Sequence, residues 1–111
     1  MRSSKAKASA FLLFSTASNL QEAKKIAQLL VKQKLAACVN IVPGLTSYFR
    51  WQGKLDQAKK YLLIIKTQKR QLKSVEAAIR KAHSYSVPEM IGFPITWGSK
   101  SYLDWLNKSA S

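Results

Sequence analysis

Residues 36–67 read AACVNIVPGLTSYFRWQGKLDQAKKYLLIIKT, and this stretch decides the fold. Its two arms are rich in β-branched and aromatic residues and meet at Gln52-Gly53, so the pattern predicts a β-hairpin with a two-residue turn. Pro43-Gly44 interrupts the first arm. Because proline cannot donate a hydrogen bond to a strand ladder, we expect a bulge or an edge position there.

The length of this hairpin has a consequence for assembly. Each arm, 36–50 or 54–67, has about 14 residues, which at about 3.3 Å per residue make a ribbon of about 45 Å. A domain of this size has a radius of gyration of about 13 Å, so the ribbon must extend beyond it. The ribbon carries Tyr48, Phe49 and Trp51, and exposed aromatic residues on such a ribbon need a covering partner. Length and composition therefore predict that the chain assembles with itself.

The elements around the hairpin follow from hydrophobic periodicity and from capping signals. They are a buried strand at 10–16, a helix from an Asn19 cap to about Lys34, a helix at 70–82, a strand at 88–96 and a short C-terminal helix. With right-handed crossovers, this order predicts an α+β fold. We expect a two-layer, ferredoxin-like split βαβ sandwich with helices on one face, a long central β-hairpin and a short C-terminal helix.

Two helix starts can be predicted in more detail. Asn19 followed by Glu22 forms a capping-box pattern in which Asn replaces the usual Ser or Thr. Ser101 with Asp104 is expected to cap the C-terminal helix in the same way. The side chains expected to pack inward from that helix are Tyr102, Trp105 and Leu106.

The chain of 111 residues is long enough for one domain, which we place at 10–111. Residues 1–9 are expected to be a disordered leader or a cloning remnant. No apolar run approaches the roughly 18 residues needed to cross a bilayer, and no signal-peptide core with a cleavage site is present. The sequence therefore predicts a soluble cytoplasmic protein with no membrane partner.

The charge of the chain is strongly positive. Its 19 Lys and Arg residues outnumber 5 Asp and Glu residues, which gives a net charge of +14. A positive potential of this size makes small anions or polyanions candidate partners. The alternative is a basic coat that serves solubility and meets polyanions only non-specifically. We expect no specific nucleic-acid binding, because core and hairpin contacts account for most aromatic residues, and single strands need an exposed stacking surface.

The chain has one cysteine, Cys38, and one histidine, His83. These counts exclude an intramolecular disulfide, a CxxC motif and a His-rich metal site within a single chain. A site with several soft ligands would therefore have to recruit neighbouring subunits. The sequence also lacks the GxSxG, HExxH, P-loop and GxGxxG motifs and offers no evident carboxylate pair, so we expect no enzymatic activity.

Four segments of the chain together resemble one known family. They are LAACVNIVPGLTSYFRWQGKL at 35–55, LLIIKT at 62–67, HSYSVPE at 83–89 and YLDW at 102–105. They are similar to the signature of the CutA divalent-cation tolerance family, and the resemblance covers residues 10–108. It implies ferredoxin-like subunits in a homotrimer, with long hairpins paired around the threefold axis as in PII-type signalling proteins. It also implies a role in tolerance of copper or another divalent cation, with no obligatory cofactor.

The resemblance makes Cys38 the leading metal candidate, together with His83 and Glu89. A cysteine thiolate is a soft ligand that suits Cu(I) or Zn(II). The alternative is that Cys38 is a small buried apolar residue with an inert thiol. His83 ends the second predicted helix, where it can also serve as a cap near the C-terminal carbonyls.

The family further implies a cleft between subunits. Its residues in this chain are Trp51, Lys66, His83, Tyr85 and Glu89. Such a set offers an aromatic platform, a cation, an imidazole and a carboxylate, which could grip a small anion or nucleotide or could equally serve interface packing. Lys60 and Ser86 stand where carboxylates are usual in the family.

Two functions therefore stay open. The favoured one is a trimeric metal-tolerance protein that binds copper or another divalent ion weakly through ligands shared between subunits. The alternative is a PII-like regulatory protein that responds to an anion or nucleotide, with the basic surface used for a phosphate-bearing ligand.

Overall fold

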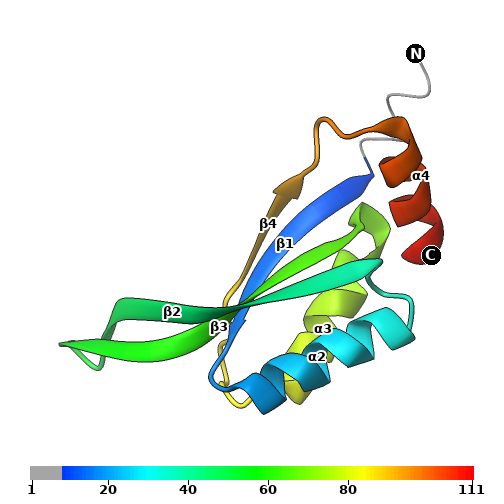
Figure 1. Cartoon of the computed structure of the whole chain (residues 1–111). Coiled ribbons are helices and arrows are strands. Elements are labelled where there is room, and N and C mark those ends of the chain that lie inside the picture. Colours follow the sequence, from blue (N-terminus) through cyan, green and yellow to red (C-terminus); the bar gives the residue numbers. More distant parts are fainter. Residues whose placement is uncertain (1–8) are drawn as a thin grey trace.

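The computed structural model describes residues 9–111 and has four strands, three α-helices and a short 3₁₀ helix (Figure 1). In chain order these are β1 Ala10–Ala17, α2 Leu20–Lys32, β2 Cys38–Trp51, β3 Lys54–Gln68, η1 Lys69–Gln71, α3 Leu72–Ala82, β4 Met90–Pro94 and α4 Lys100–Ser109. The sheet order is β2-β3-β1-β4 and every neighbouring pair is antiparallel. This topology confirms the predicted α+β, ferredoxin-like fold. Most of the predicted leader, residues 1–8, lies outside the described residues.

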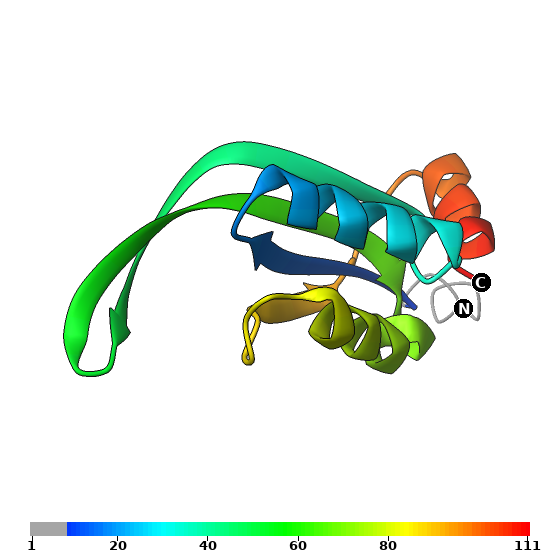
Figure 2. The same cartoon turned by 90° about the horizontal axis from the view of Figure 1, so that it is seen from below.

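The core lies between the sheet and the two long helices. Helices α2 and α3 run along the same face of the sheet (Figures 1 and 2). On β3, alternate side chains point into this layer, and Leu63 and Ile65 are fully buried. The residues that meet them from the helices are Ile26 and Leu30 of α2 and Val75 and Ile79 of α3. Each buried side chain of this size contributes about 1.5–3 kcal/mol, so this layer stabilises the platform from which the hairpin extends.

The hairpin has the turn and the bulge that the sequence predicts. Strands β2 and β3 pair from Cys38 opposite Lys66 to Trp51 opposite Lys54. The register shifts between Val42 and Leu45, which places the irregularity at Pro43-Gly44. At the tip, Gln52 and Gly53 have φ angles of 50° and 77°. Two consecutive positive φ angles are characteristic of the type I′ turn, whose twist matches that of the paired strands.

Half of the hairpin extends beyond the sheet. Strand β1 pairs with β3 only from Tyr61 to Gln68, so the tip half of the ribbon has no third strand (Figures 1 and 2). The molecule is accordingly elongated, with extents of 50 × 25 × 23 Å. Tyr48, Trp51 and Leu55 on this ribbon are 68%, 60% and 79% exposed. The predicted overhang is confirmed, and its apolar side chains are uncovered in the single chain.

One predicted helix start is confirmed and the other is wrong. The Asn19 side chain accepts a hydrogen bond from the Glu22 backbone N–H at 2.8 Å and caps α2. In contrast, α4 begins after Ser99, so Ser101 lies inside the helix, and Asp104 forms an ion pair with Lys100 at 2.8 Å. Leucines rather than aromatic residues form its buried stripe: Leu103 and Leu106 pack on Ala10 and Ala37, while Tyr102 and Trp105 are 41% and 45% exposed. Among the helices of residues 9–111, none combines the length and the apolar character needed to span a membrane.

Candidate functional site

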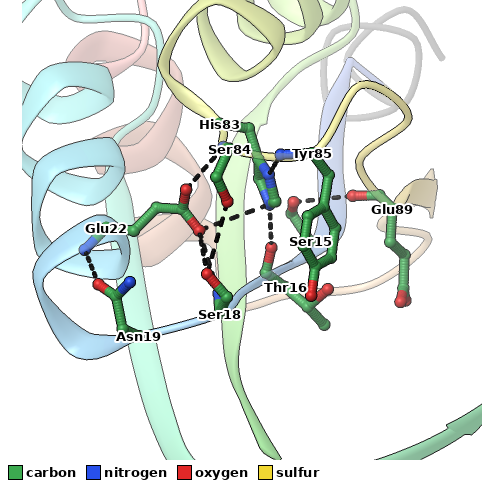
Figure 3. A network of polar contacts seen from close by, with 9 residues as sticks. All are labelled: Ser15, Thr16, Ser18, Asn19, Glu22, His83, Ser84, Tyr85 and Glu89. Carbon is green, nitrogen blue, oxygen red and sulfur yellow. Dashed lines mark hydrogen bonds and ion pairs between the residues drawn. The ribbon is translucent and has the colours of Figure 1, made fainter. Parts of the chain in front are cut away.

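A polar network joins the end of β1, the start of α2 and the loop after α3 (Figure 3). Its centre is Glu22, in the first turn of α2. Glu22 Oε1 accepts hydrogen bonds from the Ser18 backbone N–H at 3.0 Å and from the Ser18 hydroxyl at 3.1 Å. Glu22 Oε2 accepts a third from the backbone N–H of Ser84 at 2.7 Å. One carboxylate therefore ties the neighbouring end of β1 and start of α2 to the loop after α3, which is 62 residues away.

The surroundings of this carboxylate favour its ionised form. Burial raises the pKa of Glu22, but hydrogen bonds from Ser18 and Ser84, with a smaller contribution from the adjacent His83, outweigh burial, so the pKa lies below its usual value. The side chain is 10% exposed, and its position at the N-terminus of α2 is favourable for a negative charge. Glu22 is therefore a fixed, charged acceptor near neutral pH.

The ring of His83 is buried beside this carboxylate and both of its nitrogens are engaged (Figure 3). Nδ1 accepts a hydrogen bond from the Tyr85 backbone N–H at 2.9 Å. Nε2 therefore carries the ring proton and donates it to the Thr16 carbonyl oxygen at 2.6 Å. Glu22 Oε1 lies 4.0 Å from Nε2. A metal ion could use His83 only by displacing one of these two hydrogen bonds.

A cavity of about 430 Å³ opens between the hairpin tip and the loop that follows His83. Its lining residues are Phe49, Trp51 and Asp56 of the hairpin and Ser84, Tyr85, Ser86 and Val87 of the loop. Lys60 bridges the two walls, with its ammonium 5.0 Å from the Phe49 ring centroid and 4.9 Å from that of Tyr85. Each such cation–π contact stabilises by about 0.5–1 kcal/mol at an exposed site. The cavity thus combines aromatic walls with a cation at one side and a carboxylate at another.

Lys66 and Cys38 lie in a different part of the chain. They are direct partners across β2 and β3, with the Cys38 sulfur 4.0 Å from Lys66 Nζ, and Lys66 donates a hydrogen bond to Asn40 Oδ1. Cys38 is half-buried and belongs to neither core cluster of the described residues. Ala37, the residue before Cys38, packs with Leu103 and Leu106, so this thiol lies near α4.

The six predicted site residues therefore form two groups rather than one. Trp51 and Tyr85 line the same cavity, and the rings of His83 and Tyr85 lie 5.0 Å apart. Glu89 is near them in the chain, but its carboxylate is exposed and points away from the imidazole (Figure 3). Thr16, which binds the His83 ring, pairs with Leu62 of β3, whereas Cys38 pairs with Lys66. Lys66 is four residues further along β3 than Leu62, so the Cys38–Lys66 pair lies about 13 Å along the strand from the Thr16 pair. Within residues 9–111, no three His, Cys, Asp or Glu side chains gather in a geometry suited to a metal ion.

Comparison with known proteins establishes the family. The sequence profile described as CutA1 divalent ion tolerance protein matches residues 11–109. The chain belongs to the CutA1 divalent ion tolerance family. The resemblance deduced from the four sequence segments is thereby confirmed.

Several CutA proteins are similar to this chain. The divalent-cation tolerance protein CutA of Thermus thermophilus is 45% identical over 87 residues, which cover 78% of this chain and 84% of that protein. The chloroplastic protein CutA of Arabidopsis thaliana is 45% identical over 98 residues, or 88% of this chain. The chain spans 54% of the length of that plant protein. These relatives are named for CutA or for cation tolerance and not for an enzymatic reaction.

Solved CutA structures share the fold. Cut A1 from Thermus thermophilus superposes with a TM-score of 0.90 at 39% identity and covers 92% of this chain and 99% of its own. CutA from Xylella fastidiosa gives a TM-score of 0.91 at 35% identity, with coverage of 93% and 99%. The sheet order and these matches show that this CutA1 family member has the same ferredoxin-like fold as its relatives.

Sequence reasoning missed several residues of the network and the cavity. The sequence pattern predicts only a capping role for Glu22, whereas its bond to Ser84 joins residues 62 positions apart. Lys60 was noted only as a departure from the family, although it holds the two cavity walls together. Phe49 and Asp56 were not expected in the cavity. The alternation of side chains on the hairpin was the available signal for Phe49, because it shares a strand face with Trp51.

Proposed function

We propose that this CutA1 family member acts in divalent-cation tolerance as a non-enzymatic, cytoplasmic homotrimer that holds copper or another divalent ion weakly at sites shared between subunits. The observation that carries the proposal is the uncovered apolar surface of the single chain. The family assignment supports the role in cation tolerance. The assembly, the metal and the compartment are our inferences.

The surface in question has two parts. One is the overhanging hairpin with Tyr48 and Trp51. The other is the face of the sheet opposite α2 and α3, where Ile91 and Phe93 of β4 are 60% and 47% exposed and Phe93 makes an edge contact with Phe14. Exposed apolar areas of this kind mark protein interfaces. A closed assembly of identical chains would cover both parts in every subunit.

The positions of the candidate ligands favour sharing between subunits. Cys38 is half-buried near α4 on the sheet, and Glu89 is exposed on the loop before β4. Both are therefore reachable by groups from a neighbouring chain. His83 would have to give up a hydrogen bond before it could bind a metal. A site with one soft thiol and few further ligands fits weak binding of a soft ion such as Cu(I).

A second function has its own supporting observation. The cavity between the hairpin tip and the loop has Phe49, Trp51 and Tyr85 as aromatic walls and Lys60 as a cation. Together with the net charge of +14, this arrangement suits a planar, phosphate-bearing or carboxylate ligand. A PII-like response to a small anion or nucleotide is thus the alternative proposal.

One experiment tests the favoured proposal in two steps. Light scattering is expected to give a mass three times the chain mass of 12.5 kDa, maintained at micromolar subunit concentration. Copper(I) binding is then measured by equilibrium dialysis under reducing conditions, using wild type and Cys38→Ala. We expect weaker copper binding in the variant, with the trimer mass retained. A monomer mass would contradict the assembly, and unchanged copper uptake in Cys38→Ala would contradict the assignment of the thiol.

A further inference from the structure

The two helices that cover the sheet expose a set of lysines that have no carboxylate partner among residues 9–111. They are Lys24, Lys25 and Lys32 of α2 and Lys73 and Lys81 of α3, and we call this set the basic helical face. All five are exposed, on the sides of the helices opposite the buried Ile26 and Val75. Figures 1 and 2 show that α2 and α3 lie along the same side of the sheet, so the five charges belong to one surface.

The acidic residues of the chain do not neutralise this surface. The Lys or Arg ion pairs with carboxylates within residues 9–111 are Arg80 with Glu76 and Lys100 with Asp104. Glu22, the other acid on the two helices, accepts hydrogen bonds from Ser18 and Ser84 and is held at one end of α2. No carboxylate of residues 9–111 pairs with the five lysines, and like charges on one surface repel each other unless an anion binds there.

The residues between the lysines indicate which kind of polyanion fits. Gln21 and Gln28 lie in the same shallow groove on α2 as Lys25 and Lys32, and their amides can donate to phosphate oxygens. No aromatic side chain belongs to α2 or α3, so bases have nothing to stack on. Recognition there is limited to a sugar–phosphate backbone, as in a duplex whose bases stay paired.

The spacing of the lysines also suits a duplex. Lys25 and Lys32 are seven residues apart, which is about 10.5 Å along the helix axis. The phosphates of one DNA strand follow each other every 3.4 Å along the duplex axis, so these two side chains reach across about three of them. A lipid surface suits this face less well, because an interfacial helix inserts its apolar side, and here Ile26 and Leu30 are buried in the core.

We propose that the basic helical face binds the phosphate backbone of double-stranded nucleic acid without sequence preference. This interaction surface is separate from the hairpin cavity and from Cys38, and it does not depend on the proposed metal function. With about five phosphates neutralised per face, the association constant is expected to fall about 500-fold between 50 and 200 mM salt, from a slope of about 0.9 per phosphate.

The test compares two variants with the same net charge. The helix variant is K24Q/K25Q/K32Q, and the matched control is K54Q/K59Q/K108Q, which removes three exposed lysines outside the two helices. Glutamine keeps a high helix propensity, and circular dichroism and light scattering confirm that fold and mass are retained. Binding to a fluorescein-labelled 20-base-pair DNA of random sequence is followed by anisotropy at several salt concentrations. Vesicles containing anionic phosphatidylserine are measured in parallel.

The proposal predicts different salt dependences for the two variants. The helix variant keeps about two phosphate contacts, so its affinity is expected to fall only about 12-fold over the same salt range, whereas the control keeps the wild-type dependence. Equal losses in both variants would show that only the overall charge matters and would overturn the proposal. So would absence of duplex binding by the wild type at 50 mM salt, or binding to the vesicles alone.

Discussion

Replacing Glu22 by Gln removes one charge at nearly constant shape from the centre of the polar network. The carboxylate accepts from the backbone N–H groups of Ser18 and Ser84 through its two different oxygens. A glutamine amide has one oxygen, so one of these two N–H groups would face an NH₂ group and lose its acceptor. The other N–H group would keep an acceptor that no longer carries a charge.

The expected cost follows from these two changes. Hydrogen bonds to charged groups contribute about 1.5–3 kcal/mol, and the part-buried Ser18 N–H costs more to leave without an acceptor than the exposed Ser84 N–H, which water can reach. We therefore expect Glu22→Gln to lower the free energy of unfolding by about 2–3 kcal/mol. The matched control is Glu76→Gln, which removes the exposed ion pair with Arg80. An exposed pair four residues apart on a helix contributes only about 0.3–0.5 kcal/mol.

The effect should also depend on pH in a defined direction. The folded state lowers the pKa of Glu22, so its contribution is complete above the ordinary Glu pKa of 4.5 and is lost as pH falls through the lower folded value. Urea unfolding of wild type and both variants, at one fixed subunit concentration, should show the full Glu22→Gln difference at about pH 7 and a difference that shrinks steadily as the pH is lowered below 4.5.

Two results would refute this reasoning. One is a Glu22→Gln variant that loses no more stability than Glu76→Gln, because the three hydrogen bonds would then contribute no more than an exposed ion pair. The other is a stability difference that is unchanged between neutral and acidic pH, because a charged acceptor with a lowered pKa cannot produce that result.

Two further predictions concern the turn and the ions. Gln52→Asn should raise the free energy of unfolding by up to about 1 kcal/mol in thermal or urea unfolding, because Asn adopts the positive φ of 50° more readily than Gln; a destabilised variant would contradict the turn geometry. In calorimetry, Mg²⁺, Ca²⁺ and Mn²⁺ should bind at best with about millimolar affinity, because the chain has few carboxylates and a charge of +14. Phosphate-bearing anions should bind more tightly, and their affinity should fall steeply as salt is added. Micromolar binding of a hard divalent ion, unchanged by added salt, would contradict the second expectation.

The sequence predicted correctly the features that depend on near neighbours in the chain. It predicted only in part which side chains of α4 are buried. The pattern around Asn19 located the start of α2 correctly because the capping hydrogen bond spans only three residues. The same kind of pattern at Ser101 misplaced the start of α4 by two residues. Tyr102, Trp105 and Leu106 were expected inside; Leu106 is buried, but Leu103 and not the two aromatic residues joins it against Ala10 and Ala37. Hydrophobic periodicity does not distinguish an aromatic stripe from an adjacent aliphatic stripe on the same helix. The shape of the surface against which the helix packs determines which of the two stripes is buried.

The candidate site was predictable in its residue types but not in its grouping. Trp51 and Tyr85 were expected together and do line one cavity. The family resemblance implies that Lys66 joins them in a cleft between subunits; within the single chain Lys66 lies beside Cys38, because register places it at the far end of β3. A side chain's position along a strand pair depends on the exact register and on where the third strand begins, and neither can be read from residue types alone.

The sequence by itself determined the ferredoxin-like element order, the long hairpin with its Gln52-Gly53 turn and the strong positive charge. All three depend on composition, periodicity or hydrogen bonds between near neighbours. Only the tertiary structure decided that Glu22 would bind Ser84 and that His83 Nε2 would donate to the Thr16 carbonyl oxygen. The physical reason is chain separation: the partners lie more than 60 residues apart, so their contact exists only after the sheet and both helices have packed.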